Sequence, residues 1–207
     1  MKRKILSWVF VLGFFGPIAA FAAEGCTLNQ VLGNATVLRD GQTMPMKEND
    51  ALKKGDLLQT GPDCQVDMSM NDLAGCRVLA GSKVEVMGWK PENMSLSVTE
   101  GNVILNLKKL PEGSVFKLET PAAVAAVRGT QFWGRVDTQK TDDPVTTFAV
   151  REGEVEILDK ATSRTFSLKK GEALDISKDS SAPAVVRAAL EGEMKAMEQA
   201  DGIPTQA

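Results

Sequence analysis

The segment "TPAAVAAVRGTQFWGRVD", Thr120 to Asp137, decides how the rest of this sequence is interpreted. Small apolar residues lead into a Val-Arg-Gly-Thr motif, and a Phe-Trp pair follows. Thr120 and Pro121 are expected to begin a strand, because proline at a first strand position removes no ladder hydrogen bond. Gly129, in the interior of the same pattern, indicates a bulge or a close backbone contact.

Arg128 places a fixed charge in this otherwise buried pattern. We expect a structural role, in which the guanidinium folds over the turn and donates several hydrogen bonds to unpaired carbonyls nearby. The functional alternative is a contact with a ligand carboxylate or a partner protein. Phe132 and Trp133 point to opposite faces of a strand, so we expect one in the core and the other partly exposed. The residues singled out as structural motif or partner contact are Thr120, Pro121, Arg128, Gly129, Thr130, Phe132 and Trp133.

Apolar residues alternate with polar ones along most of the chain. Val66, Met68 and Met70 share one face of such a run, and Val155 and Ile157 share another. Turn signals separate the runs, as at Gly61-Pro62-Asp63 and Pro111-Glu112-Gly113. Many short strands at this spacing predict an all-β fold, either a β-solenoid or roll or a sandwich.

Two short motifs occur twice. LKKGDLL at 52–58 returns as LKKGEAL at 168–174, and VTEGNV at 98–103 returns as VREGEV at 150–155. In each copy a glycine beside a charged residue can reverse the backbone, because glycine adopts positive φ without strain. The repeats indicate one strand-turn-strand unit used several times.

The period changes near the C-terminus. Val186, Leu190, Met194 and Met197 recur at helical spacing, so residues 181–207 are expected to hold an amphipathic helix and a loose tail. Its apolar stripe is expected to dock on the β body, with partner binding as the second interpretation.

The N-terminus indicates export. Lys2, Arg3 and Lys4 precede an apolar run, and small residues follow, so residues 1–22 are expected to be a cleaved signal peptide. No later stretch is long and apolar enough to span a membrane. Glu24 and Gly25 fit a lipoprotein cleavage site at Cys26 poorly. We therefore expect a periplasmic or secreted protein.

Removal of the signal peptide leaves 21 basic and 27 acidic residues, a net charge near −6. Such a chain has no electrostatic footprint for nucleic acid or for an anionic membrane surface. In an oxidising compartment, the three cysteines predict one bridge and one free thiol. Cys64 and Cys76, which flank a turn near Asn71-Asp72, are the expected pair.

The chain contains no histidine and no tyrosine. This removes the commonest general base, the nucleophile pairs that depend on histidine, and histidine metal sites. The acidic residues mostly alternate with apolar ones and are interpreted as solvent-facing strand positions. We therefore expect no enzyme activity, no cofactor and no metal, with a carboxylate-based hydrolase as a remote alternative.

The opening segment, together with FAVREGEVEI at 148–157, resembles the FecR-type domain of the ferric-citrate regulator family. GDLLQTGPDCQVDM at 55–68, VLAGSKVEV at 78–86 and LKKGEALDI at 168–176 extend the resemblance over residues 31–177. The resemblance implies an all-β, non-catalytic domain at 23–180 that binds partner proteins. Regulators of this family carry a cytoplasmic sigma-factor-binding region before a membrane span, and three basic residues after Met1 leave no room for one. We therefore expect a stand-alone exported copy of the domain.

Two functions agree best with the sequence. The first is a non-catalytic periplasmic signalling or envelope-assembly module that recognises an envelope protein through strand edges or the Arg128 to Trp133 segment. The second is a cell-wall or polysaccharide-binding module. That function needs exposed aromatic residues, and only Trp89 and Trp133 remain as tryptophans after signal cleavage.

Overall fold

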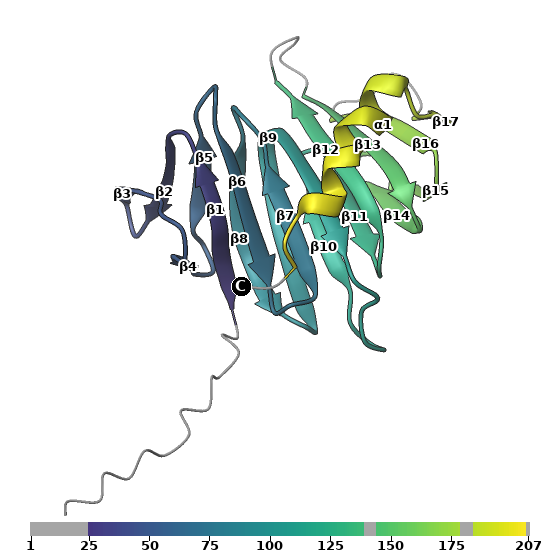
Figure 1. Ribbon diagram of the computed structural model, residues 1–207. Helices are drawn as coiled ribbons and strands as arrows, with labels where there is room; N and C mark the ends of the chain where they lie inside the picture. Colours follow the sequence, from purple (N-terminus) through teal and green to yellow (C-terminus); the bar gives the residue numbers. More distant parts are fainter. Residues whose placement is uncertain (1–24, 139–143, 179–183, 206–207) are drawn as a thin grey trace, which may run out of the picture.

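The computed structural model describes residues 25–138, 144–178 and 184–205, and these ranges are built mainly of β-strands (Figure 1). The expected all-β class is therefore confirmed. The signal peptide expected at residues 1–22 lies outside the described residues. Within the described ranges, no helix has the length and apolar character that crossing a membrane requires.

The strands form two layers, sheet A and sheet B, joined through the long strand β9 (Asn93–Leu107). Residues 93–100 of β9 pair in sheet B, and residues 101–107 pair in sheet A. In spatial order, sheet A holds β4 (Ala51–Leu52), β1 (Cys26–Leu32), β6 (Gln65–Met70), β7 (Ala74–Val78), β9, β12 (Gln131–Asp137), β13 (Val145–Glu152), β16 (Glu172–Ser177) and β17 (Val186–Ala188). Sheet B holds β3 (Gln42–Pro45), β2 (Ala35–Arg39), β5 (Leu57–Thr60), β8 (Lys83–Lys90), β9, β10 (Phe116–Glu119), β11 (Ala123–Val127), β14 (Glu154–Asp159) and β15 (Thr165–Lys169).

The core lies between the two sheets and follows from the alternating sequence. Side chains of a strand point alternately to its two faces, so one set of positions is buried and the other faces outward. In β14, Val155 and Ile157 are buried, whereas Glu154 and Glu156 are exposed. Phenylalanines from three strands fill the interior: Phe116, Phe132 and Phe148.

The chain passes between the sheets at glycine corners. The repeated motifs supply four of them: Gly55 before β5, Gly101 inside β9, Gly153 before β14 and Gly171 before β16. Their φ angles are 87°, 88°, 83° and 80°, in the region that favours glycine. Repeated crossing between two facing layers corresponds to the expected roll or sandwich.

Some corners are packed directly against the next one. A Cβ atom on Gly101 would lie 2.5 Å from Ser82 Cα and 2.7 Å from Gly81 O. The Ser82 hydroxyl also accepts a hydrogen bond from Asn102 N at 2.9 Å and donates one to Asn102 O at 3.2 Å. These contacts hold successive turns of the chain together at the edge of the roll.

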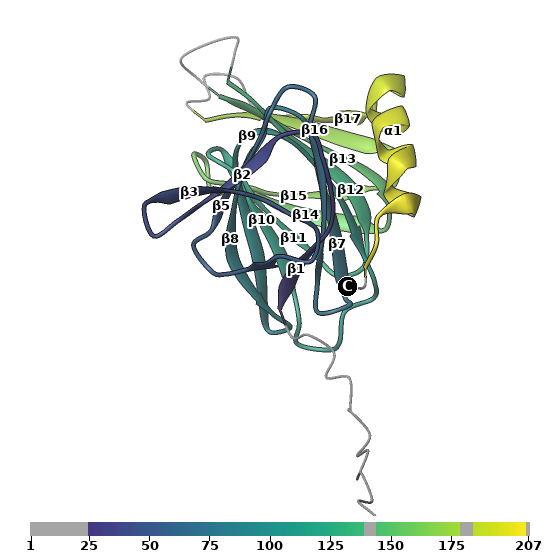
Figure 2. The ribbon, with the colours of Figure 1, turned by 60° about the vertical axis from the view of Figure 1, so that its left-hand side comes forward.

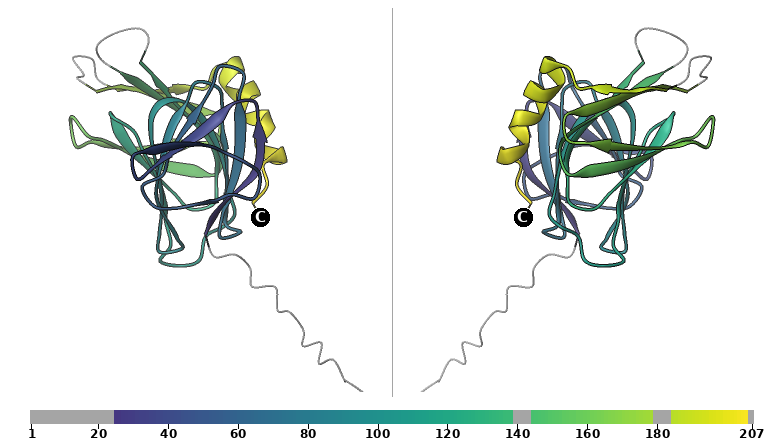
Figure 3. Two further views of the ribbon diagram at one scale, coloured as in Figure 1. Left: turned by 90° about the vertical axis from the view of Figure 1, so that its left-hand side faces the viewer. Right: turned by 90° about the vertical axis from the view of Figure 1, so that its right-hand side faces the viewer.

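The C-terminal segment covers the outer face of sheet A (Figures 2 and 3). It contains helix α1 (Glu191–Met197) and the 3₁₀ turn η1 (Glu198–Gly202). The helix begins later than the apolar spacing predicted, because Val186–Ala188 instead add strand β17 to β16. Met197, Ala200 and Ile203 of this segment pack on an apolar strip of the sheet formed by Ile104, Trp133, Ala149 and Ala173.

The expected bridge between Cys64 and Cys76 is absent, since all three cysteines are free and buried. The hairpin register explains this result. Cys76 lies opposite Met68, so Cys64 is four residues further along the partner strand. At about 3.3 Å per residue this offset is roughly 13 Å, beyond the reach of a disulfide.

Candidate functional site

The segment from Thr120 to Asp137 contains β11, a corner and β12. Gly129 is the corner residue, with φ +96°, and a Cβ atom there would lie 2.9 Å from Lys109 Cα. A register shift follows at Gln131/Phe132 in the pairing with β13. The glycine therefore occupies both a left-handed conformation and a close backbone contact.

Thr120 and Pro121 lie in the turn that precedes β11. The hydroxyl of Thr120 accepts a hydrogen bond from Ala123 N at 3.0 Å, and Thr120 itself is buried. Thr146 of β13 donates to the same hydroxyl at 3.1 Å. These contacts tie the start of β11 to the opposite sheet and give Thr120 an architectural environment.

Phe132 and Trp133 point to opposite faces of β12, and both are buried. Phe132 lies in the core between the sheets. Trp133, for which partial exposure was one of the expected outcomes, is only 7% exposed because the C-terminal segment covers it. Neither ring is therefore available to an external ligand.

Arg128 is exposed at the edge of the roll. Its Nη2 donates a hydrogen bond to Pro111 O at 3.2 Å, which is its single hydrogen bond within the described residues. A guanidinium has five N–H donors, so most of its donor capacity is open to solvent. The several hydrogen bonds expected from a structural arginine are not made.

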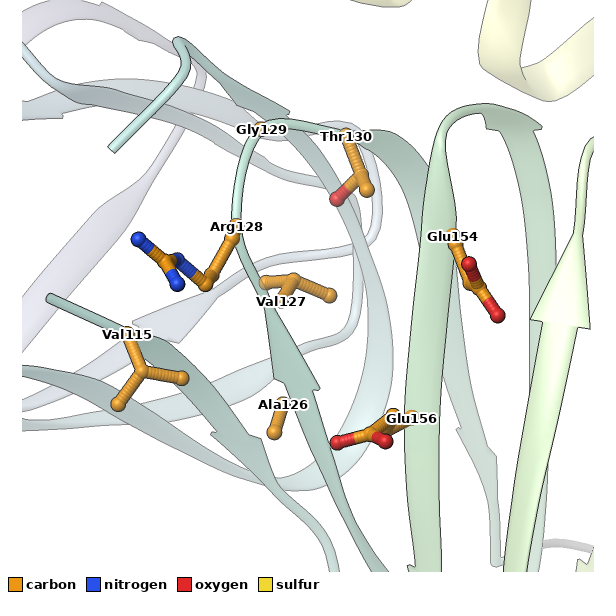
Figure 4. A pocket seen from close by; sticks show the side chains of 8 residues that line it. All are labelled: Val115, Ala126, Val127, Arg128, Gly129, Thr130, Glu154 and Glu156. Atoms are coloured by element: carbon orange, nitrogen blue, oxygen red, sulfur yellow. The ribbon is translucent and has the colours of Figure 1, made fainter. Parts of the chain in front are cut away.

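A cavity of about 370 Å³ lies beside this arginine, and we call it the corner cleft. Figure 4 shows its side chains, with Arg128 and Val115 on one side and two glutamates on the other. It is lined by Val115, Ala126, Val127, Arg128, Gly129, Thr130, Glu154 and Glu156. The small side chain of Ala126 leaves space between the two walls.

Strand register explains how the two walls come together. Ala126 of β11 pairs with Glu156 of β14, and on its other side with Lys117 of β10. Because these three residues point to the same outward face, Ala126 lies between the Lys117 ammonium group and the Glu156 carboxylate. Glu154 and Glu156, 26 and 28 residues downstream of Arg128, thereby reach the same cleft.

The charges on the two walls are not paired with each other. Glu154 accepts a hydrogen bond from the Ser167 hydroxyl, on the side away from Arg128. Among the described residues, Glu156 makes no ion pair and Arg128 makes none. The cleft therefore has one positive and one negative wall.

Thr130 is placed at the end of the cleft and is only 4% exposed. Its methyl group is directed at Gly153, where an added Cβ would lie 2.6 Å from Thr130 Cγ2. Its hydroxyl is directed to the Arg128 side in Figure 4 and has no hydrogen-bond partner among the described residues. A buried hydroxyl without a partner is unfavourable, so a ligand that contacted this oxygen would gain a hydrogen bond.

The cleft lacks the arrangement that a carboxylate-based hydrolase requires. Glu154 and Glu156 lie two residues apart on one strand and face the same way, whereas glycoside hydrolysis needs two carboxyl groups that flank the bond. The opposite wall carries Arg128. Within the described residues, no group of three potential metal ligands is found.

Comparison with known proteins identifies the domain. Residues 56–156 match the family model described as FecR protein, a narrower range than the motifs indicated. The fold is similar to that of a "putative anti-sigma factor" from Parabacteroides distasonis ATCC 8503, solved at 1.65 Å and at 2.50 Å resolution. Both structures match with a TM-score of 0.57 and 17% identity, covering 69% of this chain and 64% of that chain. This chain thus matches less than two thirds of that protein's length, and at this identity the likeness concerns the fold alone.

A search of curated proteins gave no significant match. The family match nevertheless contains every residue that lines the corner cleft, from Val115 to Glu156. Residues 56–156 of this chain are therefore a FecR-type domain.

Proposed function

We propose that the mature chain is an exported, non-catalytic FecR-type module that recognises a protein partner in the cell envelope. The observation that carries the proposal is the exposed Arg128 at a corner of the FecR-type domain. Gly129 makes the close backbone contact at this corner, and the guanidinium makes one hydrogen bond among the described residues. An exposed arginine with free donors is well suited to bind carboxylates of another molecule.

Signalling is the role that this module would serve. The FecR match and the fold shared with a described anti-sigma factor support a regulatory protein. In this proposal the exported domain detects a state of the envelope by binding one protein. The alternative, a polysaccharide-binding module, is less well supported, because the covered ring of Trp133 cannot stack on a sugar.

Capture from an envelope extract tests the proposal. The mature chain, residues 23–207, is immobilised in three forms: wild type, Arg128→Ala, and Arg135→Ala as a control. Arg135 is also exposed but lies on sheet A, outside the corner cleft. We expect one defined protein on wild type and on Arg135→Ala, and its loss from Arg128→Ala.

Three other results would contradict the proposal. Retention of the chain by purified peptidoglycan, without a captured protein, would favour the polysaccharide-binding alternative. Turnover of a sugar polymer by the purified chain would show an enzyme. Capture that is unaffected by Arg128→Ala would place the partner surface elsewhere, for example on an exposed strand edge such as β3.

A further inference from the structure

We propose that the corner cleft binds a small zwitterionic ligand of amino-acid or dipeptide size, which carries one carboxylate and one ammonium group. This goes beyond recognition of a protein partner, because it assigns the cleft a small molecule of its own. The proposal rests on the polarity of the two walls, on the unpaired Thr130 hydroxyl and on the size of the cavity.

The polarity of the cleft arises because the side chains of Arg128 and Glu154 bind other partners and not each other. Continuing the register of β11 and β14 places Arg128 opposite Glu154, within reach of an ion pair. Instead, Arg128 donates to Pro111 O, and Glu154 accepts from Ser167. The space between them is left without an internal counter-charge.

The carboxylate of the ligand is assigned to the Arg128 end. There the guanidinium has open N–H donors, and the Thr130 hydroxyl can donate a further hydrogen bond. Lys117, exposed on the outward face of β10 in the row of Ala126, adds positive charge on the same side. Charge-assisted hydrogen bonds of this kind are the strong ones in proteins.

The ammonium group is assigned to the opposite wall. Glu156 is exposed and makes no ion pair within the described part of the chain. Its side chain points toward Ala126 in Figure 4, over the floor of the cleft. Glu154 stands two residues away on the same face and reinforces the negative wall.

The same features exclude other ligand classes. A free anion such as phosphate would meet Arg128 but would be repelled by two nearby carboxylates. A neutral sugar would leave both charged walls unpaired. The volume of about 370 Å³ is at the lower end for small-molecule sites, which span roughly 300–1,000 Å³, so it fits a compact ligand.

Titration calorimetry with matched probes tests the inference on the purified mature chain. The probes are alanyl-alanine, its N-acetyl form without the cation, its C-terminal amide without the anion, and inorganic phosphate. We expect saturable binding of the intact dipeptide and about tenfold or greater loss when either charge is blocked, since each charged contact contributes at least that factor.

Variants assign the two charges to their walls. Arg128→Gln should abolish the preference for a free carboxylate, and Glu156→Gln should abolish the preference for a free amine. Glu85→Gln, on β8 of the same sheet and outside the cleft, is the matched control and should bind as wild type does. Thr130→Val should weaken dipeptide binding severalfold without lowering the unfolding midpoint, because the hydroxyl it removes has no partner among the described residues.

Equal binding of the N-acetyl form, binding of phosphate in place of the dipeptide, or no saturable binding would each overturn the inference. These results are independent of the capture experiment, because calorimetry needs no partner protein. Dipeptide binding without protein capture would refute the proposed function alone. Capture that depends on Arg128, without dipeptide binding, would refute the zwitterion site alone.

Discussion

The two sequence repeats allow a direct test of the stacked corners. Gly101 and Gly171 have almost the same φ, 88° and 80°, so alanine at either position meets the same conformational strain. Their surroundings differ. A Cβ atom on Gly101 would lie 2.5 Å from Ser82 Cα, whereas nothing lies within 4 Å of one on Gly171. We predict that Gly101→Ala destabilises the protein much more than Gly171→Ala.

The magnitudes follow from these contacts. Left-handed φ costs a residue with a side chain about 1–2 kcal/mol, which is the whole expected effect at Gly171. Overpacking against backbone atoms adds about 1–3 kcal/mol at Gly101. Displacement of Ser82 would also weaken its two hydrogen bonds to Asn102, each contributing about 1 kcal/mol or less. We therefore expect about 2–7 kcal/mol for Gly101→Ala and about 1–2 kcal/mol for Gly171→Ala.

Urea unfolding of the mature chain, followed by tryptophan fluorescence, measures both values. The other copy of each motif serves as a replicate: a Cβ atom on Gly153 would lie 2.6 Å from Thr130 Cγ2, and one on Gly55 would have no neighbour within 4 Å among the described residues. Alanine at Gly153 should therefore be costly and alanine at Gly55 mild. If the free energies of unfolding of all four variants agree within about 0.5 kcal/mol, the contacts between corners do not stabilise the fold.

Three further predictions follow from individual contacts. Arg128→Ala should lower the free energy of unfolding by less than about 1 kcal/mol, because the exposed side chain makes one hydrogen bond among the described residues. A decrease above about 2 kcal/mol in urea unfolding would support the structural role expected from the sequence. Thiol titration of unfolded, non-reduced protein should find three thiols, and a single reactive thiol would show a disulfide. The thiols of the native protein should react slowly, because burial raises the pKa of Cys26 to about 12 and that of Cys76 well above its ordinary value. Burial alone would raise the pKa of Glu193 and of Asp175, but hydrogen bonds from Arg187 outweigh burial and hold both pKa values below the ordinary carboxyl range. Their stabilising contribution should therefore be complete above about pH 4.5 and lost as the pH falls through the lowered pKa values. Urea unfolding midpoints measured by tryptophan fluorescence at a series of pH values should show this step, and Arg187→Gln should remove it.

The alternation of apolar and polar residues was sufficient to predict the strands and the all-β class. Val155 and Ile157 are buried and their glutamate neighbours exposed, as a period of two requires. The repeated glycines were also informative, because positive φ at Gly101 and Gly171 is a local property of the chain. The motifs do not indicate which corners are in contact. Ser82 lies against Gly101 because two separate turns of the chain pack together.

The disulfide prediction was wrong for a reason present in the sequence. Asn71 and Asp72 have positive φ and form the expected turn, and a hairpin closed there pairs residues at equal distances from it. Cys76 lies four positions after Asp72 and Cys64 eight positions before it. Equal spacing would have selected Met68 as the neighbour of Cys76, as the register shows.

Trp133 and the corner cleft depend on segments far apart in the chain. The indole ring is covered by Met197 and Ile203, more than 60 residues downstream. The sequence around Trp133 does not predict this contact. The negative wall of the cleft comes from Glu156, which joins Arg128 through the register of β11 with β14. From the sequence alone, Glu156 is one of several alternating glutamates that face solvent.

We interpret the role of Arg128 from the contacts of its two neighbours. Gly129 makes the close approach to Lys109, and the methyl group of Thr130 packs against Gly153, so these two residues meet the structural demands of the corner. The guanidinium makes one hydrogen bond, to Pro111 O, among the described residues. Its open donors, next to a buried hydroxyl without a partner in the same part of the chain, support the proposal that the two bind a ligand together.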